Sequence, residues 1–407
     1  ADASRSTEEE AATRSSRDLD AENGTTESIT IQLNADGKPE SEGGSGHWKC
    51  DDATSFNLLL YDGTFTLKPS SEPGAKSALQ TELDIREGAE FNGGTVGDYT
   101  YNNGTISGGI FQGTVENRTS YTGEESIPGV IRGGTFQGPV DNWGTISNGT
   151  FQGRVHNSGT ISDGTFQEEV YNNDGTISGG TFQRKVDNAG TISDGTFQGE
   201  VINDYSYDYA ASKYIPGVIS GGVFQGNVNN HGNISDGTFQ GEVYNNKTIS
   251  DGTFQGEVFN YGIISDGTFQ REVYNHNTIS GGTFEKRMTL MNEDSAPITI
   301  SDGLFNGAVV DEGCASPLSI TGGLFTQAVD VSKTIPDNLS ITGGYFVSKP
   351  TVPEGSVSFT SVSDRNYRAF YVPVNDGFSE NRYNSLYVPC GSSEQPNTIT
   401  VKTPTKL

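Results

Sequence analysis

Apolar residues recur at a fixed spacing through the middle of the chain. The stretch from Ser235 to Asn260 reads SDGTFQGEVYNNKTISDGTFQGEVFN, so DGTFQGEV occurs twice and Phe239 and Phe254 stand fifteen residues apart. The same phenylalanine recurs at positions 111, 136, 151, 166, 182, 197, 224, 239, 254, 269 and 284. Eleven copies are too many for chance, so one structural unit repeats along the chain.

Each copy carries three apolar residues at constant offsets, such as Ile249, Phe254 and Val258. Each is flanked by polar residues, in TIS, TFQ and EVY, and a strand of period two points the middle residue inward and its neighbours outward. The spacing follows no helical period of 3.6 residues. The pattern predicts an all-β fold, a single-stranded parallel β-helix (β-solenoid) with triangular coils of about 15 residues stacked about 4.8 Å apart.

Glycine and asparagine occupy the corners of the predicted coil. Asp163, Gly179 and Asn148 alternate at the site before a glycine, which favours a left-handed turn at that site. Asparagine stands two residues after the valine at positions 117, 142, 157, 172, 188, 203, 230, 245, 260 and 275. Two residues beyond an inward valine points inward again, so we expect a buried asparagine ladder that satisfies backbone groups of the turns.

The repeat divides the chain. We expect a disordered leader over 1–27, an N-terminal cap with imperfect coils over 28–103, and regular coils over 104–285 with insertions at 118–130 and 204–218. Wider coils follow over 286–349, where the phenylalanine spacing lengthens, and a C-terminal β cap or module over 350–407. Caps are expected because open strand edges invite pairing with other chains.

Composition excludes several partners. Only 32% of the 407 residues are hydrophobic and 54 are glycine, which fits a thin core supplied by repetition. The 25 basic residues face 52 acidic ones, a net charge of −27, which argues against nucleic acid and acidic membranes. No apolar run is long enough to predict a membrane span. Cys50, Cys314 and Cys390 are too few and too dispersed for a disulfide framework, and a Cys314–Cys390 bridge or three thiols both remain open.

The ISGGTF and ISDGTF copies, with the later SITGGLF and SITGGYF, resemble repeats of secreted bacterial surface proteins of adhesin type, built on parallel β-helices similar to the pectate-lyase-like group. The likeness covers about residues 104–346 and is one of repeat style, with no catalytic motif. The resemblance implies an extracellular or cell-surface location.

Function is sought where the repeat is interrupted. The two insertions fall at the same corner and end alike, in SIPGVIRGG and YIPGVISGG. They carry Tyr121 in the first and Tyr205, Tyr207, Tyr209 and Tyr214 in the second. Exposed tyrosines on loops held by a rigid scaffold are typical of recognition surfaces, although they also serve simply to cover a corner.

Two further rows of aromatic residues are candidates for ligand binding. The position after the ladder asparagine, at the insertion corner, holds Trp143, His231, Tyr261 and His276. The outward position after the valine holds Tyr244, Phe259 and Tyr274 in three consecutive coils. The second row favours stacking of its rings on one another, with stacking on a sugar chain as the alternative.

Other chemistry has weaker support. The columns Glu242, Glu257, Glu272 and Asp236, Asp251, Asp266 make calcium conceivable, but neither spans the array. The outward pairs of TIS (Thr145 with Ser147, Thr160 with Ser162, Thr176 with Ser178, Thr191 with Ser193) resemble the faces of some insect antifreeze proteins. The four histidines have no metal spacing and no catalytic triad is apparent, so we expect no enzyme and no cofactor.

The sequence therefore predicts a secreted or surface-displayed β-solenoid that serves as a rigid spacer and an adhesin-like binding platform. Its expected ligand is a glycan or a host surface protein. A polysaccharide-active lyase or hydrolase and an ice-binding protein that uses the Thr-x-Ser face are the alternatives.

Overall fold

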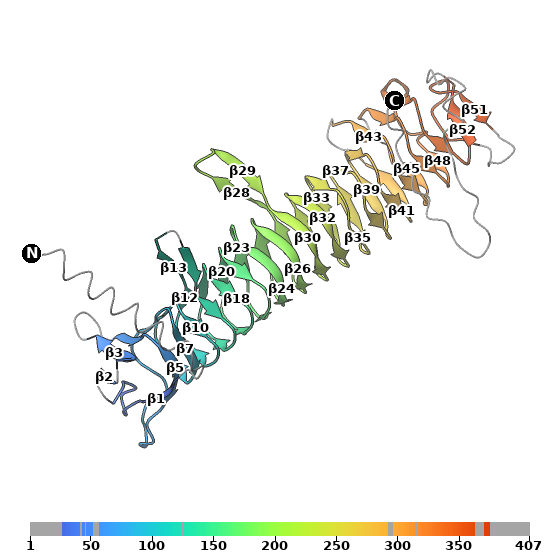
Figure 1. Cartoon of the computed structure of the whole chain (residues 1–407). Helices are drawn as coiled ribbons and strands as arrows, with labels where there is room; N and C mark the ends of the chain where they lie inside the picture. The colour runs from blue at the N-terminus through green and yellow to red at the C-terminus, as the bar shows by residue number, and fades with distance from the viewer. Residues whose placement is uncertain are drawn as a thin grey trace, which may run out of the picture. The chain divides into compact units, whose positions relative to one another are not determined.

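A computed structural model describes residues 27–40, 43–44, 46–51, 57–123, 125–291, 296–313, 316–362 and 370–374 (Figure 1). The chain forms two compact units, 1–138 and 139–407, which are described separately. The expected leader, Cys314, Cys390 and most of the expected C-terminal module lie outside the described residues.

Each regular coil of the second unit contributes strands to three rows. The isoleucine row contains β18 (Thr145–Ile146), β21 (Thr160–Ile161), β34 (Thr248–Ile249), β37 (Ile263–Ile264), β40 (Thr278–Ile279), β43 (Ile298–Ile300), β46 (Leu318–Ile320) and β49 (Leu339–Ile341). The phenylalanine row contains β19 (Thr150–Phe151), β22 (Thr165–Phe166), β35 (Thr253–Phe254), β38 (Thr268–Phe269), β41 (Thr283–Phe284), β44 (Leu304–Phe305), β47 (Leu324–Phe325) and β50 (Tyr345–Phe346). The valine–asparagine row contains β17 (Val140–Asn142), β20 (Val155–Asn157), β23 (Val170–Asn172), β25 (Val186–Asn188), β27 (Val201–Asn203), β31 (Val228–Asn230), β33 (Val243–Asn245), β36 (Val258–Asn260), β39 (Val273–Asn275), β42 (Met288–Leu290), β45 (Val309–Asp311) and β48 (Val329–Asp330).

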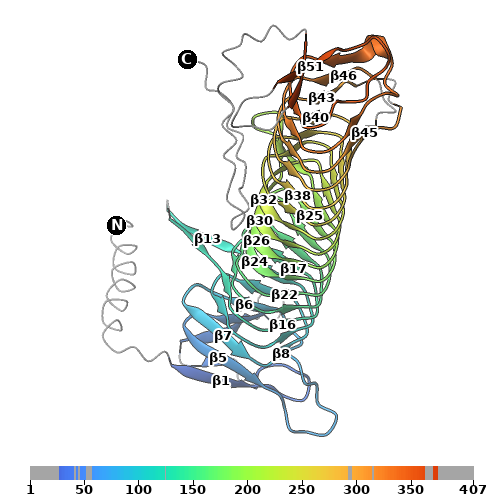
Figure 2. The same cartoon turned by 90° about the vertical axis from the view of Figure 1, so that its right-hand side faces the viewer.

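These strands pair in parallel with the same row of the next coil, which confirms the parallel β-helix. Ile146 pairs with Ile161, Phe151 with Phe166, and Asn157 with Asn172. In four consecutive coils the first two rows fuse into single seven-residue strands, β24 (Thr176–Phe182), β26 (Thr191–Phe197), β30 (Val218–Phe224) and β32 (Asn233–Phe239), visible side by side in Figure 2. The expected three separate three-residue strands are thus replaced by strands of two, three or seven residues.

The core consists of stacked columns. The repeat isoleucines, phenylalanines and valines of the second unit are buried, as the pattern predicted. Successive rings from Phe151 to Phe346 lie 4.5–4.9 Å apart between centroids and within 6–8° of parallel. The column continues through the wider coils, so their additional residues are accommodated at corners.

The asparagine ladder is present and buried. From Asn142 to Asn275 each Nδ2 donates to the Oδ1 of the next asparagine at 2.6–2.8 Å. The same Nδ2 atoms reach corner carbonyls, as Asn188 does to the oxygen of Gly190 at 3.2 Å. The ladder therefore supplies partners to backbone groups that a dry core would leave unpaired.

The turn before the phenylalanine differs from the prediction. Positive φ falls on the glycine itself, +131° at Gly164 and +102° at Gly180, and not on the preceding residue. Asp163 instead accepts a hydrogen bond from the Gly164 amide at 2.7 Å, and Asn148 does the same for Gly149. The prediction of a left-handed Asp or Asn was wrong because the side chain binds the next amide and leaves the left-handed backbone to glycine.

The first unit contains less regular coils. Its strands are β1 (Ser28–Gln32), β2 (Gly43–Gly44), β3 (Trp48–Asp51), β4 (Asn57–Leu60), β5 (Gly63–Lys68), β6 (Leu83–Ile85), β7 (Ala89–Gly93), β8 (Thr95–Val96), β9 (Thr100–Asn102), β10 (Thr105–Ile106), β11 (Ile110–Phe111), β12 (Val115–Asn117), β13 (Thr119–Thr122), β14 (Glu125–Pro128), β15 (Val130–Ile131) and β16 (Thr135–Phe136). Parallel rows run β4–β6–β9–β12 and β1–β5–β7–β10–β15. Strand β3 pairs antiparallel with β4 of the first row, and β2 pairs antiparallel with β3.

The end of the second unit is closed by antiparallel strands. A single 3₁₀ turn, η1 (Pro336–Asn338), precedes β49. Strand β52 (Phe370–Pro373) pairs antiparallel with β51 (Phe359–Val362), and Tyr371 of β52 pairs with Phe346 of β50. Strand β52 thus covers the edge of β50 in the last coil.

Candidate functional site

The insertion of the second unit is an antiparallel hairpin that projects from the coils (Figure 1). Strands β28 (Tyr205–Asp208) and β29 (Lys213–Pro216) pair so that Tyr207 faces Tyr214 and Asp208 faces Lys213. The Asp208 carboxylate accepts hydrogen bonds from the amides of Ala210 and Ala211 at 2.9 Å, which fixes the turn. The sequence predicted an insertion here but not its pairing.

The hairpin leaves the solenoid undisturbed. Gly217 donates its amide hydrogen to the Asp204 carbonyl at the base of the hairpin. The Gly217 carbonyl then accepts from Asn203 Nδ2 at 3.2 Å, just as Gly190 does from Asn188 in the preceding coil. A Cβ on Gly217 would meet Asn203 Oδ1 at 2.7 Å, so glycine is required where the hairpin rejoins the coil. The hairpin is therefore an addition to a complete coil.

Four tyrosines gather on one face of this hairpin. Tyr205 contacts Tyr214, and Tyr207 contacts both Tyr209 and Tyr214, with ring centroids 4.9–5.0 Å apart and interplanar angles of 64–82°. Edge-to-face packing of this kind is the favourable arrangement for aromatic rings. The side chains stay open to solvent, from 40% for Tyr207 to 87% for Tyr209. Four solvent-exposed aromatic rings on a rigid base form the principal candidate site, here called the tyrosine face.

The insertion of the first unit is the hairpin β13–β14, with a different surface. In the alignment of the two hairpins, Tyr121 corresponds to Tyr207 and is 77% exposed. Tyr121 pairs across the hairpin with Ser126, whereas Tyr207 pairs with Tyr214. The chain thus offers one hairpin with four tyrosines and one with a single tyrosine.

The corner residues form no single site. Trp143 and Tyr261 are about half exposed, and His231 is exposed. Tyr261 stacks on His276 of the next coil with centroids 4.3 Å apart. These residues share the corner at which the β28–β29 hairpin leaves the second unit. Between Trp143 and the others, however, lie several coils whose corner residues are small or polar.

In the outward row that follows the valines, the aromatic rings stack on one another. Phe259 stacks between Tyr244 and Tyr274 at 4.8 Å on either side, within 6–8° of parallel. The Tyr244 hydroxyl donates to Glu242 at 2.9 Å and the Tyr274 hydroxyl to Glu272 at 3.1 Å. The hydrogen bond to Glu242 raises the pKa of Tyr244, and burial followed by the bond to Glu272 raises that of Tyr274. Because the rings cover one another, the geometry supports a structural role for this row.

The aspartate column is engaged in the turns. Asp236, Asp251 and Asp266 each accept the amide hydrogen of the following glycine at 2.7–2.8 Å. Among the residues that the structure describes, no three His, Cys, Asp or Glu side chains gather in a way that could hold a metal ion. The geometry therefore gives no support to calcium binding by these columns.

The serines of the Thr-x-Ser face are directed to the backbone. Ser162, Ser178 and Ser193 donate to isoleucine carbonyls of the preceding coil at 3.3 Å. Their hydroxyl hydrogens are therefore committed along the coil axis. In the array of hydroxyls expected for an ice-binding face, these serines are thus engaged with the backbone.

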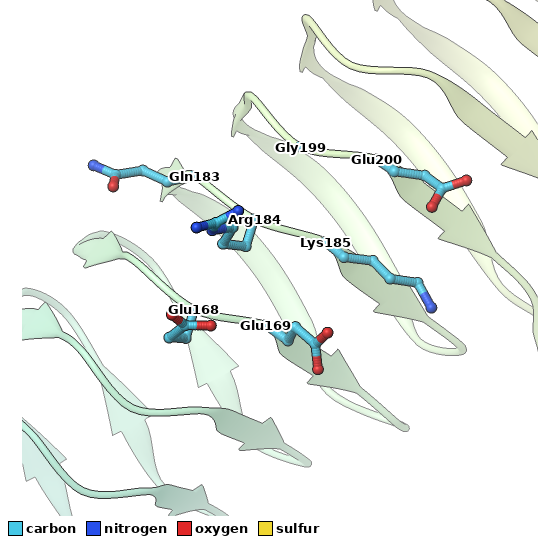
Figure 3. Close-up of a pocket in the computed structure, with 7 residues that line it drawn as sticks. All are labelled: Glu168, Glu169, Gln183, Arg184, Lys185, Gly199 and Glu200. Carbon is cyan, nitrogen blue, oxygen red and sulfur yellow. The ribbon is translucent and has the colours of Figure 1, made fainter.

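An open depression of about 390 Å³ lies between three coils of the second unit (Figure 3). The residues that line it come from three successive coils: Glu168 and Glu169 from the first, Gln183, Arg184 and Lys185 from the second, and Gly199 and Glu200 from the third. Lys185 is paired with Asp187 at 2.9 Å and Glu169 with Arg154 at 3.5 Å. The charges alternate by coil and compensate one another, which is typical of a solvated surface.

Two arginine sites were missed in the sequence analysis. In the first unit Arg118 lies over the Tyr101 ring, 4.0 Å from its centroid, and pairs with Glu116 at 2.6 Å. In the second unit Arg154 lies 5.4 Å from the Tyr171 centroid and pairs with Glu169. The signal that could have found them is positional: in both cases tyrosine occupies the outward position just before the row's asparagine, and a glutamate lies close to it, Glu116 in β12 and Glu169 just before β23.

Comparison with known proteins finds no matching family model, no matching curated protein and no matching solved structure. Among the described residues, none of the helical segments has the length and apolarity needed to cross a membrane.

Proposed function

We propose that this chain is a β-solenoid scaffold that presents the tyrosine face of the β28–β29 hairpin to a ligand, as an adhesin-like protein exposed on or outside a cell. The single observation that carries the proposal is the exposure of Tyr205, Tyr207, Tyr209 and Tyr214 on one face of a hairpin added to a complete coil. A monomeric protein seldom leaves four contacting aromatic rings open to solvent without using them in recognition.

The scaffold supports this role because the hairpin contributes no residue to the core columns of the coils. The Phe, Ile, Val and Asn columns continue through the coils on both sides of the insertion. A binding element on such a base loses little conformational entropy when it meets its ligand, since its backbone is already fixed. The resemblance to adhesin-type repeats agrees with a surface location, and the ligand class under this proposal is a glycan or a host surface protein.

The test compares the whole chain with a triple variant, Tyr205→Thr, Tyr209→Ser and Tyr214→Ser, on arrays of glycans and of purified cell-surface proteins. We expect the variant to lose capture by at least about tenfold, because interface tyrosines are typical hot spots. Tyr121→Ser in the other hairpin is the matched control and should retain capture. Equal capture by the triple variant and the unaltered chain would show that the hairpin is not the binding element.

A further inference from the structure

The tyrosine face combines exposed aromatic rings with a strongly acidic chain, and we infer that it binds arginine side chains carried by a basic peptide segment of a partner protein. This inference rests on the proposed function and names the ligand chemistry of the same site. Its ligand is a guanidinium group on a peptide, and not a sugar.

The protein itself holds arginine in this way. Arg118 lies 4.0 Å from the centroid of the Tyr101 ring and is paired with Glu116. Arg154 lies 5.4 Å from the Tyr171 centroid and is paired with Glu169. A planar guanidinium group stacks on an aromatic face and loses less hydration than an ammonium group does. In both units a tyrosine with a nearby carboxylate is therefore a guanidinium site.

The hairpin offers the rings without an arginine. Residues 204–216 contain four tyrosines, Asp204, Asp208 and Lys213, and no arginine. In the strand register Lys213 lies opposite Asp208, and both side chains lie on the face of the hairpin that Tyr207 does not occupy. The exposed fractions of 67% for Tyr214 and 87% for Tyr209 leave ring faces accessible to a cation from outside.

The negative charge of the chain favours a positively charged ligand. The chain carries a net charge of −27, which draws basic segments toward it and repels polyanions. Asp208 alternates with Tyr205 and Tyr207 along β28, so its carboxylate lies on the other face, and Asp204 stands just before the strand; both act through the field around the hairpin. Binding should therefore weaken as salt is added.

Ring geometry disfavours the sugar alternative. A sugar chain stacks best on rings that lie in one plane, whereas the four tyrosines are tilted by 64–82° to their neighbours. Tilted rings present separate faces at different angles, and an arginine can stack on any one of them. Two arginines on one flexible peptide can use two faces at once, which increases the apparent affinity.

In the test, the peptide acetyl-Gly-Arg-Gly-Arg-Gly-amide is titrated into the whole chain. The tyrosine rings of the chain are isotope-labelled and followed by NMR. Peptides with lysine or citrulline in place of arginine are the chemical controls. We expect ring shifts at the hairpin tyrosines, about tenfold weaker binding of the lysine peptide, and loss of binding for citrulline, which keeps the shape and removes the charge. Equal binding of the citrulline peptide would overturn the inference.

The matched protein variant is Tyr205→Thr with Tyr214→Ser, which places on this hairpin the residues that its counterpart has at Thr119 and Ser126. It should bind the arginine peptide about tenfold less tightly, while Tyr121→Ser leaves binding unchanged. Unchanged binding by the double variant would also overturn the inference. If array capture depends on the hairpin but no arginine peptide binds, the inference fails and the scaffold proposal stands. If the hairpin variants capture the ligand as well as the unaltered chain does, both fail.

Discussion

At the scale of single residues, the position in the coil decides what each side chain does. An asparagine in the ladder is buried and bonded to its neighbours on both sides, whereas the asparagine one residue later, such as Asn246, is exposed. Aspartate before the glycine serves as a hydrogen-bond acceptor for the turn, and tyrosine after the valine stacks and donates to a glutamate. The same residue type therefore has a structural role in one row and remains available for recognition in another.

The ladder makes a prediction about stability. Asn188→Ala removes the acceptor of Asn172 and the donor to Asn203 and Gly190, so buried polar groups lose their partners. We expect a loss of about 3 kcal/mol in the free energy of unfolding, measured by urea denaturation. Asn246→Ala, on the exposed corner, is the control and should change stability by less than about 0.5 kcal/mol. A small effect at Asn188 would mean that the ladder contributes little.

The outward row makes a prediction about pH. The raised pKa of Tyr244 means that its bond to Glu242 contributes stability below the ordinary tyrosine pKa and that this contribution is lost as pH rises through the raised value. Glu242→Gln should lower the Tyr244 pKa toward its ordinary value, as followed by NMR of ¹³C-labelled tyrosine rings. Glu257, which influences Tyr244 through charge alone, supplies the control: Glu257→Gln should lower this pKa by less.

At the scale of elements, the coil and the hairpin are independent. The corner between the ladder asparagine and the next glycine takes one residue in most coils and a hairpin in two, yet the register on either side is kept. The reason is that the ladder bond to the glycine carbonyl closes the corner whatever lies between them.

This independence predicts the effect of trimming. Replacing residues 204–216 with a single alanine reproduces the Asn188–Ala189–Gly190 corner of the preceding coil. Thermal unfolding followed by circular dichroism should shift by no more than a few degrees, because no core column is touched. Replacing Gly217 with alanine in the intact chain is the contrasting change and should destabilise it clearly, since the added Cβ would lie 2.6 Å from the Asp204 carbonyl oxygen. A large loss on trimming would show that the hairpin supports the coils.

At the scale of the whole molecule, a stack of parallel strands has to end without exposing an edge. In the second unit β52 pairs antiparallel with β50, and β51 pairs antiparallel with β52, in contrast to the parallel pairing used between coils. At β50 a second chain therefore meets an antiparallel strand in place of a free parallel edge.

Ending the chain after Thr351 should remove this protection. The edge of β50 would then be open to pairing with another molecule, so we expect concentration-dependent oligomers or fibres, detected by light scattering and electron microscopy. The full-length chain at the same concentration is the control. A truncated chain that remains monomeric would show that the net charge of −27 suffices to keep the molecules apart.

The regular part of the fold was predictable because the repeat presents each row ten or eleven times. The inward Ile, Phe and Val columns and the asparagine ladder follow from side-chain alternation alone, and the structure confirms them. The turn was less predictable, because Asp251 and Gly252 share one task and the sequence does not say which of them takes the unusual backbone angle.

The sequence by itself determined the coil period, the core columns and the two places where the repeat is interrupted, since alternation along a strand and the spacing of glycines are local properties. Only the tertiary structure decided that the second interruption is a hairpin with four tyrosines on one face, and that Arg118 rests on Tyr101. Those contacts join residues that occur once, and their placement depends on backbone pairing and on rings that meet across strands. No repeated pattern encodes them, so they become visible only when the chain is folded.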